Sequence, residues 1–107
     1  MIYELRIYEA MPGKLPALNT RFADITMGYF EKHGLKQIGY WTESIGTSGR
    51  LTYMLAFNDM AHRESAWASF IADPDRIKAF AETERDGLLV ARIENKILRP
   101  TAYSPLK

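Results

Sequence analysis

Residues 35–57 read LKQIGYWTESIGTSGRLTYMLAF, and this stretch decides the fold. It has two apolar, aromatic-rich halves, Leu35–Ile45 and Leu51–Phe57, separated by Gly46-Thr47-Ser48-Gly49. Two such halves around a glycine-bounded turn predict a pair of strands joined as a hairpin. In the second strand the residues expected to share one face are Leu51, Tyr53, Leu55 and Phe57.

A helix is predicted before the hairpin, from Lys14 to His33, with Gly34 placed to end it in the left-handed conformation. Gly28 inside this helix costs about 1 kcal/mol relative to alanine, so we expect close packing there. Upstream, Ile2–Tyr8 alternates in polarity and predicts a strand. The helix positions that recur at spacings of three and four are Leu15, Leu18, Phe22, Ile25 and Tyr29.

After the hairpin, Asn58 or Asp59 is placed to cap a second helix. Asp73 followed by Pro74 ends that helix and starts another. Leu88–Arg99 predicts a last strand. The order β-α-β-β-α(α)-β gives the ferredoxin-like α+β fold, a split βαβ arrangement with a four-stranded antiparallel sheet covered by helices on one face, in one domain spanning residues 1–107.

The uncovered sheet face is expected to face water or another chain. On the first strand the face opposite Tyr3, Leu5 and Ile7 is predicted to be the uncovered one. Its mixed polarity is typical of a partly polar homodimer interface, although an ordinary solvated face with incidental ion pairs is the alternative. The candidate interface residues are Glu4, Arg6 and Tyr8 of the first strand and Arg92 and Glu94 of the last, with ion pairs expected across the two strands.

Composition and charge exclude several classes of protein. The chain has no cysteine, so disulfides and thiolate metal sites are excluded. Its net charge of +1 gives no basic field for nucleic acid or an anionic membrane. No apolar stretch is long enough to span a bilayer, and the N-terminus has Glu4 where a secretory signal would be basic and then apolar. We therefore expect a cytoplasmic protein.

Several segments together resemble the NIPSNAP family. They are Tyr3-Glu4-Leu5-Arg6-Ile7-Tyr8, Pro12-Gly13-Lys14, Gly39-Tyr40-Trp41, Asn58-Asp59-Met60-Ala61-His62-Arg63 and the tail from Leu98-Arg99-Pro100 to Tyr103-Ser104-Pro105-Leu106. The resemblance covers nearly the whole chain in the right order. It implies a homodimeric α+β barrel, a superfamily that includes small oxygenases, heme-associated proteins, isomerases, lyases and stress-response proteins. It implies no settled activity, and we do not extend the mitochondrial location of some eukaryotic members to this chain.

The two histidines are the side chains whose ordinary pKa lies nearest neutrality. His33 is expected to cap the first helix. His62 lies in the first turn of the second helix and in a segment that resembles the family, so it is the candidate catalytic base or ligand contact. A structural role for His62 is an equal alternative.

Aromatic residues at strand and helix spacing predict either simple core or the walls of a small-molecule pocket. Arg6 and Arg92 could bind a carboxylate, but ion pairing with Glu4 and Glu94 is the favoured interpretation. The candidate pocket residues are Tyr40, Trp41, Phe57, Arg63, Trp67 and Phe70.

Motifs for other chemistries are missing. His33, His62, Glu31 and Glu64 have no metal-ligand spacing, so neither a metal nor another cofactor is expected. No phosphate-binding loop or nucleophile elbow is present. The second strand of the hairpin lacks the glycine and paired aromatics of RNA-binding domains, which disfavours nucleic acid.

Three functions remain open at this point. The first is a cofactor-independent oxygenase, isomerase or lyase acting on a small, partly apolar molecule. The second is a dimer that binds such a molecule without turnover, and the third, ranked lower, is a partner-docking dimer. Whether the protein is an enzyme at all is undecided by the sequence.

Overall fold

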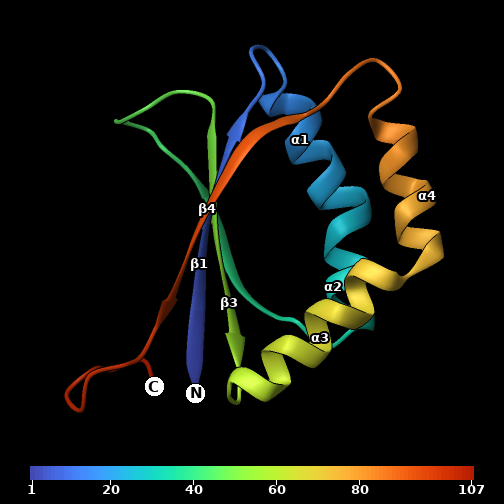
Figure 1. Cartoon of the computed structure of the whole chain (residues 1–107). Coiled ribbons are helices and arrows are strands. Elements are labelled where there is room, and N and C mark those ends of the chain that lie inside the picture. The colour runs from blue at the N-terminus through green and yellow to red at the C-terminus, as the bar shows by residue number, and fades with distance from the viewer.

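The computed structural model describes residues 1–107 and has the predicted order of elements. The strands form one antiparallel sheet in the order β2-β3-β1-β4, and the helices all lie on one of its faces (Figure 1). The ferredoxin-like α+β fold is therefore confirmed. The elements are β1 (Ile2–Ala10), α1 (Leu15–Arg21), a π-helical turn η1 (Phe22–Thr26), α2 (Met27–Lys32), β2 (Lys36–Thr42), β3 (Arg50–Phe57), α3 (Met60–Ala72), α4 (Pro74–Thr83) and β4 (Val90–Leu98).

The helix boundaries follow from local chemistry. Asp59 caps α3, because its Oδ1 accepts a hydrogen bond of 2.8 Å from the backbone N–H of His62. Asp73 caps α4 in the same way, accepting from the N–H groups of Asp75 and Arg76. Gly34 follows α2 with a φ of +77°, a left-handed conformation that glycine adopts without strain.

The first helical segment is continuous from α1 to α2, but η1 changes which residues face the sheet. Leu18 and Phe22 are buried as predicted. After the π turn the buried positions are Thr26 and Phe30, and the predicted Ile25 and Tyr29 are only partly buried. A π turn inserts one extra residue into the helix, so the buried stripe moves by one position.

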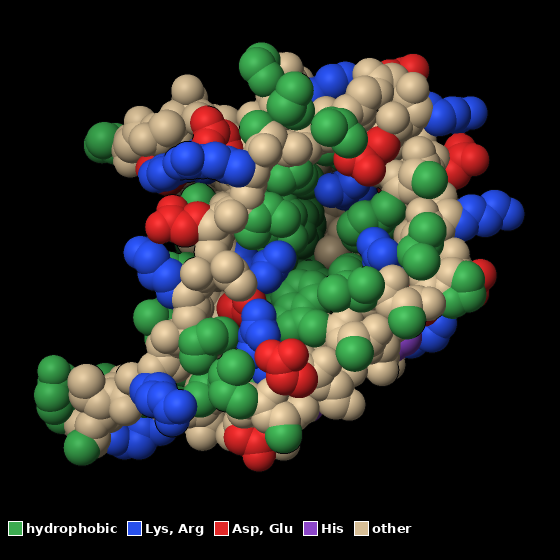
Figure 2. All heavy atoms as spheres, in the orientation of Figure 1, with side chains coloured by type: hydrophobic (Ala, Val, Ile, Leu, Met, Phe, Trp, Pro, Cys, Tyr) green, Lys and Arg blue, Asp and Glu red, His purple; other side chains and the backbone are tan.

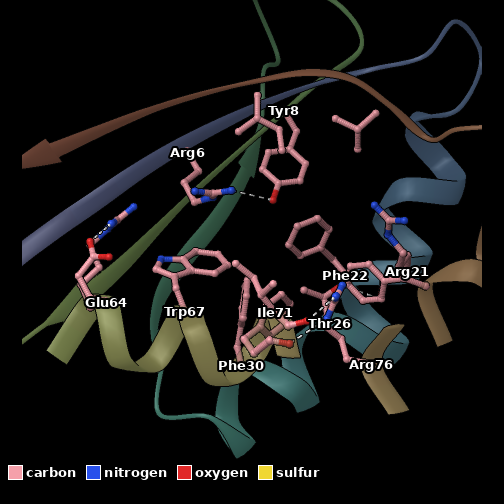
Figure 3. Close-up of a pocket in the computed structure, with 15 residues that line it drawn as sticks. Arg6, Tyr8, Arg21, Phe22, Thr26, Phe30, Glu64, Trp67, Ile71 and Arg76 are labelled. Carbon is pink, nitrogen blue, oxygen red and sulfur yellow. Dashed lines mark hydrogen bonds and ion pairs between the residues drawn. The ribbon is translucent and has the colours of Figure 1, made fainter. Parts of the chain in front are cut away.

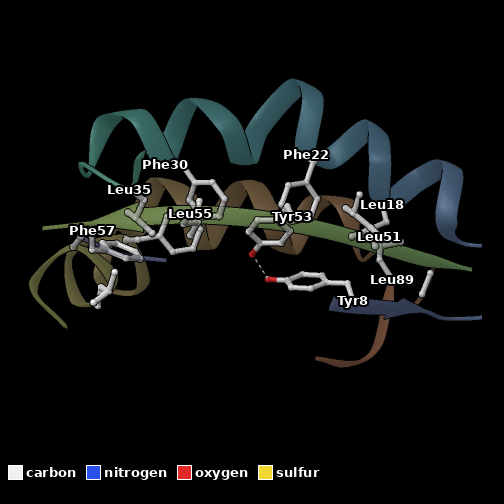
Figure 4. Packing of buried hydrophobic residues seen from close by; sticks show 14 residues of the cluster. Tyr8, Leu18, Phe22, Phe30, Leu35, Leu51, Tyr53, Leu55, Phe57 and Leu89 are labelled. Atoms are coloured by element: carbon white, nitrogen blue, oxygen red, sulfur yellow. Dashed lines mark hydrogen bonds between the residues drawn. The ribbon is translucent and has the colours of Figure 1, made fainter. Parts of the chain in front are cut away.

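The hydrophobic core lies between β3 and this helical segment (Figure 4). Phe22 packs against Tyr53 with ring centroids 5.1 Å apart, and Phe30 packs against Phe70 at the same distance. The first contact packs η1 against β3, and the second packs α2 against α3. The fully or almost fully buried side chains of the core are Leu18, Phe30, Leu35, Leu51, Tyr53, Leu55, Phe57 and Leu89.

The predicted orientation of β1 is wrong. Glu4, Arg6 and Tyr8 stand opposite Leu55, Tyr53 and Leu51 of β3, and therefore point toward the helices. The polar face of the strand is buried because its charged groups are paired there, as the site below shows. The apolar face of Tyr3, Leu5 and Ile7 lies on the uncovered side.

The predicted orientation of β4 is correct at Arg92 and Glu94, which stand opposite Glu9 and Ile7 on the uncovered face. The expected ion pairs with Glu4 and Arg6 do not form. Instead Arg92 Nε lies 2.8 Å from Glu9 Oε2, and Glu94 pairs with Lys96. No helix of the structure is both long and apolar enough to cross a membrane.

Candidate functional site

A cavity of about 480 Å³ lies between β1, the start of β4 and the helices. Figure 2 shows it as a hollow with an apolar floor and with basic side chains around it. Its volume falls in the range of about 300–1,000 Å³ that is usual for small-molecule sites. The lining residues are Arg6, Tyr8, Arg21, Phe22, Thr26, Phe30, Arg63, Glu64, Trp67, Phe70, Ile71, Arg76, Phe80, Val90 and Ile93.

Aromatic side chains form much of the apolar wall. Trp67 stands edge-on to Phe30 and Phe70, with ring centroids 5.7 and 5.4 Å apart. Phe70 in turn meets Phe80 of α4 at 6.1 Å. This packing holds the rings in place, so the wall is formed before any ligand arrives.

The π turn provides another part of the wall. Arg21 ends α1, and Phe22 and Thr26 are the first and last residues of η1. Thr26 Oγ1 donates a hydrogen bond to the carbonyl oxygen of Arg21, at 3.4 Å. The widened turn thus brings three lining side chains to one place, and π turns often occur at functional sites.

Arg21 is the least satisfied cation of the cavity. Its residue is 6% exposed, but only Nη1 has a partner, Thr83 Oγ1 at 3.3 Å, and Glu84 lies 3.7 Å away. Nε is buried without a hydrogen-bond partner. Burial lowers the pKa of Arg21 from its ordinary value, and the nearby Glu84 offsets this only in part.

Arg6, by contrast, has a hydrogen-bond partner at each of its three nitrogens. Its Nε donates to Tyr53 Oη at 2.8 Å, its Nη1 to Glu4 Oε2 at 3.0 Å and its Nη2 to Tyr8 Oη at 3.3 Å. The guanidinium also lies over the ring of Trp67, 4.5 Å from its centroid. Burial alone would lower the pKa of Arg6, but the two tyrosine oxygens and Glu4 outweigh it and raise that pKa.

Glu4 holds several side chains of the cavity wall in place through its buried carboxylate. The carboxylate is fully buried and accepts hydrogen bonds from Arg63, from Trp67 Nε1 at 2.8 Å and from Asn95 Nδ2 at 3.0 Å, besides that from Arg6. Burial would raise the pKa of Glu4, but these donors outweigh it and lower the pKa to about 2. The carboxylate is therefore ionised and serves as a fixed acceptor.

The remaining basic side chains of the cavity are already engaged. Arg63 binds Glu4 through Nε and Nη2, and Glu64 through Nη1. Arg76 donates to the carbonyl oxygens of Phe70 and Ile71 at the end of α3. Arg21 thus has the fewest hydrogen bonds among the arginines of the cavity, and its Nη2 has no partner in the chain.

A family model matches nearly the whole chain. The NIPSNAP model matches residues 3–105. The chain belongs to the NIPSNAP family. A crystal structure of a NIPSNAP family protein of unknown function from Agrobacterium tumefaciens is 30% identical, with a TM-score of 0.88, covering 100% of this chain and 94% of that one.

Other solved structures are similar too. An uncharacterised NIPSNAP-like domain protein from Burkholderia xenovorans is 25% identical, with a TM-score of 0.85 over 97% of this chain and 88% of that one. A protein from Deinococcus radiodurans, named as a candidate antibiotic biosynthesis monooxygenase, shares 12% identity and a TM-score of 0.60 over 100% and 99% of the two chains. That likeness shows the fold alone. Comparison with the curated proteins finds no match.

The structure of this NIPSNAP protein brings half of the predicted pocket residues together. Arg63, Trp67 and Phe70 line the cavity. Tyr40 and Phe57 belong to the packed core, where Tyr40 stacks on Tyr53. Trp41 stands opposite Thr52 on the uncovered face and is half exposed.

The histidines serve the backbone and a helix cap. Asn58 donates its backbone N–H to His62 Nδ1 at 2.9 Å, and His62 Nε2 lies 3.1 Å from the carbonyl oxygen of Gly34. Both ring nitrogens are therefore engaged, and His62 does not line the cavity. His33 is the C-cap residue of α2, and its Nε2 lies 2.7 Å from Asp73 Oδ2. No group of three His, Asp or Glu side chains gathers as a metal site.

Sequence reasoning missed Tyr8, Arg21, Phe22 and Thr26 as wall residues. Arg21 did leave a signal, because it lies three residues after Leu18, on the apolar side of the helix. A charged residue at such a position is either paired or functional. Nothing in the sequence pattern indicates that Thr26 lines the cavity, because its position depends on the π turn.

Proposed function

We propose that this NIPSNAP protein binds a small organic acid, with a carboxylate and an apolar, preferably aromatic body, in the cavity beside Arg21. The incomplete hydrogen bonding of the buried Arg21 guanidinium is the observation that supports this most. A planar guanidinium binds a carboxylate through two parallel hydrogen bonds. The aromatic wall of Phe22, Trp67 and Phe70 would bury the body of the ligand.

The charges of the wall favour an anion. Four of the lining residues are arginines and one, Glu64, is acidic. Glu64 is itself paired with Arg63 at 2.8 Å. Because the buried Glu4 pairs with Arg6 and Arg63, the positive charge that a carboxylate would meet comes mainly from Arg21 and Arg76, and electrostatic attraction there is stronger than in bulk water.

The proposal includes a homodimer formed through the uncovered face of the sheet. Leu5, Ile7 and Met54 lie on that face together with Leu98, which is 39% exposed. The pairs Glu9–Arg92 and Glu94–Lys96 place both charge signs at its β4 edge. An apolar centre with a polar rim is the usual anatomy of a protein interface.

A cofactor-independent enzyme acting on the same ligand is the second candidate. The observation in its favour is the Tyr8 hydroxyl, which lies at the cavity wall beside the Arg6 guanidinium. A hydroxyl so placed can donate a proton to a ligand oxygen. Mass spectrometry of the acid after incubation with the protein separates turnover from simple binding.

Ligand binding is testable through Trp67. A Trp41→Phe background leaves Trp67 as the single tryptophan, and it lies in the cavity wall. We expect benzoate or cinnamate to change its fluorescence in a saturable way. Arg21→Met keeps the volume of the side chain and should weaken binding by about tenfold or more, since a charge-assisted hydrogen bond contributes about 1.5–3 kcal/mol.

The matched control is Arg85→Met. Arg85 is an exposed arginine whose ion pair with Glu82 lies outside the cavity. Its replacement should leave the affinity unchanged. Equal affinities for the Arg21 and Arg85 variants, or no saturable binding to the Trp41→Phe protein, would refute the proposed function.

A further inference from the structure

The Tyr8 hydroxyl lies within hydrogen-bonding distance of two groups of the chain. Its oxygen lies 3.3 Å from Arg6 Nη2 and 3.0 Å from Tyr53 Oη. Arg6 Nε also donates to Tyr53 Oη at 2.8 Å. The three groups form a closed triangle of hydrogen bonds, in which the Arg6 guanidinium donates to both tyrosine oxygens.

The protons of this triangle have one satisfactory arrangement. Tyr53 is fully buried and accepts from Arg6, so its own proton needs an acceptor inside the protein, and Tyr8 Oη is the one within reach. Tyr8 Oη then accepts from both Tyr53 and Arg6. Its own proton has no acceptor in the chain.

Tyr8 directs this proton toward the cavity. The side chain lines the cavity, and Figure 3 shows its hydroxyl facing the open space between Arg6, Trp67 and Phe22. Phe22 meets the Tyr8 ring edge-on at 5.5 Å, which fixes the direction of the ring. A donor that is polarised by a cation and held by packing is suited to an oxygen that bears negative charge.

We propose that Tyr8 donates a hydrogen bond to a phenolate or enolate oxygen of the ligand, so that the ligand is a hydroxyaryl or enolic acid. The inference rests on the proposed function, because it takes the carboxylate of the same ligand to lie at Arg21. The two oxygens need different partners. A carboxylate suits the fork of Arg21, whereas a single phenolic oxygen suits one O–H donor with a guanidinium behind it.

The experiment uses aromatic acids with and without an ionisable phenol. The probes are 4-hydroxybenzoate and 4-hydroxycinnamate, which differ in length, and their 4-methoxy counterparts. Because a phenolate absorbs at longer wavelength than a phenol, absorption spectra across a pH series report how much of the bound hydroxy acid is ionised. We expect binding to the full-length protein to lower the pKa of the phenol of at least one hydroxy acid by about one unit, which is a tenfold change in the ionisation ratio.

Tyr8→Phe should abolish this shift, and saturable binding of the methoxy acids to this variant shows that it is folded. Tyr3→Phe is the matched control, since Tyr3 lies on the same strand but points to the other face of the sheet. It should behave as the unaltered protein.

The outcomes separate the two proposals. If none of the acids binds, both the proposed function and the role of Tyr8 are refuted. If the acids bind but the phenol ionises as in water, or ionises equally in the Tyr8→Phe protein, Tyr8 does not recognise the oxygen and only the carboxylate proposal stands.

Discussion

At the scale of single residues, Glu4 joins the sheet to one wall of the cavity. Its buried carboxylate accepts from side chains of β1, α3 and β4. Three of its donors, Arg6, Arg63 and Trp67, also line the cavity. A buried charge held by several donors stabilises only while the whole set is intact, because removal of one member leaves the others desolvated and unpaired.

Replacing Glu4 with glutamine should therefore destabilise the fold at neutral pH, by on the order of 3 kcal/mol. The pKa of Glu4 is about 2 in the folded protein, against an ordinary 4.5. The unfolded chain thus binds more protons between these values, so the contribution of Glu4 is complete above about pH 5 and is lost as the pH falls toward 2.

Urea unfolding of the Glu4→Gln and unaltered proteins at pH 7 and pH 3 measures this. We expect the free energies of unfolding of the unaltered and Glu4→Gln proteins to differ strongly at pH 7 and less at pH 3. Glu9→Gln is the control, because Glu9 is exposed on the same strand, and its pair with Arg92 should contribute little. A difference that is the same at both pH values would contradict this account of Glu4.

His62 is expected to contribute to stability and not to the cavity. His62→Ala removes the acceptor of the Asn58 N–H and the contact with the carbonyl oxygen of Gly34. It should lower the free energy of unfolding by about 1–2 kcal/mol. Affinity for cinnamate should be unchanged. A loss of cinnamate binding in a folded His62→Ala protein would show that His62 contributes to ligand binding.

At the scale of elements, the sequence predicts the presence of each helix and strand better than which face is buried. The pattern of β3 is decisive, because Leu51, Tyr53, Leu55 and Phe57 are apolar while the intervening residues are less so. In β1 both faces are partly apolar. There the burial of Glu4 and Arg6 depends on donors from α3 and β4 that local alternation cannot reveal.

The first helical segment shows a second limit of the same kind. Periodicity of 3.6 predicts the buried stripe correctly up to Phe22 and is one residue off beyond it. The extra residue of η1 has no sequence signature, because a π turn is stabilised by what surrounds it and not by propensity. Arg21 and Thr26 could not have been assigned to one wall before the turn was known.

Gly28 offers a test at this scale. The expected close packing is not there, since a Cβ at Gly28 would meet nothing within 4 Å. Gly28→Ala should raise the free energy of unfolding by about 0.5–1 kcal/mol through helix propensity. Gly34→Ala is the matched contrast and should be destabilising, because φ is +77° there. Thermal unfolding of both variants shows whether each replacement raises or lowers stability. Destabilisation by Gly28→Ala would contradict the finding that a methyl group at Gly28 meets no neighbouring atom.

At the scale of the whole molecule, one face of the sheet has no helix. The apolar alternation of β1 points to this side and not to the core, which is the reverse of the prediction from its sequence. Leu5, Ile7 and Met54 lie near the middle of this uncovered face and are the apolar residues on which the proposed dimer depends. The candidate interface residues therefore change from Glu4, Arg6 and Tyr8 to these, while Arg92 and Glu94 stay as candidates at the edge.

Met54→Asp should convert the proposed dimer into a monomer, because it would place a carboxylate in the apolar centre of the interface. Ser65→Asp adds the same charge at an exposed position of α3 and should leave the dimer intact. Size-exclusion chromatography with light scattering measures both masses. An unaltered protein that is monomeric, or a Met54→Asp protein that remains dimeric, would refute the interface.

A crystal structure of the protein grown with saturating 4-hydroxycinnamate tests most directly whether the cavity beside Arg21 binds an organic acid. We predict a ligand between Phe22 and Trp67, its carboxylate within hydrogen-bonding distance of Arg21 and its phenol oxygen at Tyr8. A ligand bound elsewhere on the molecule, or an empty cavity under those conditions, would contradict the account.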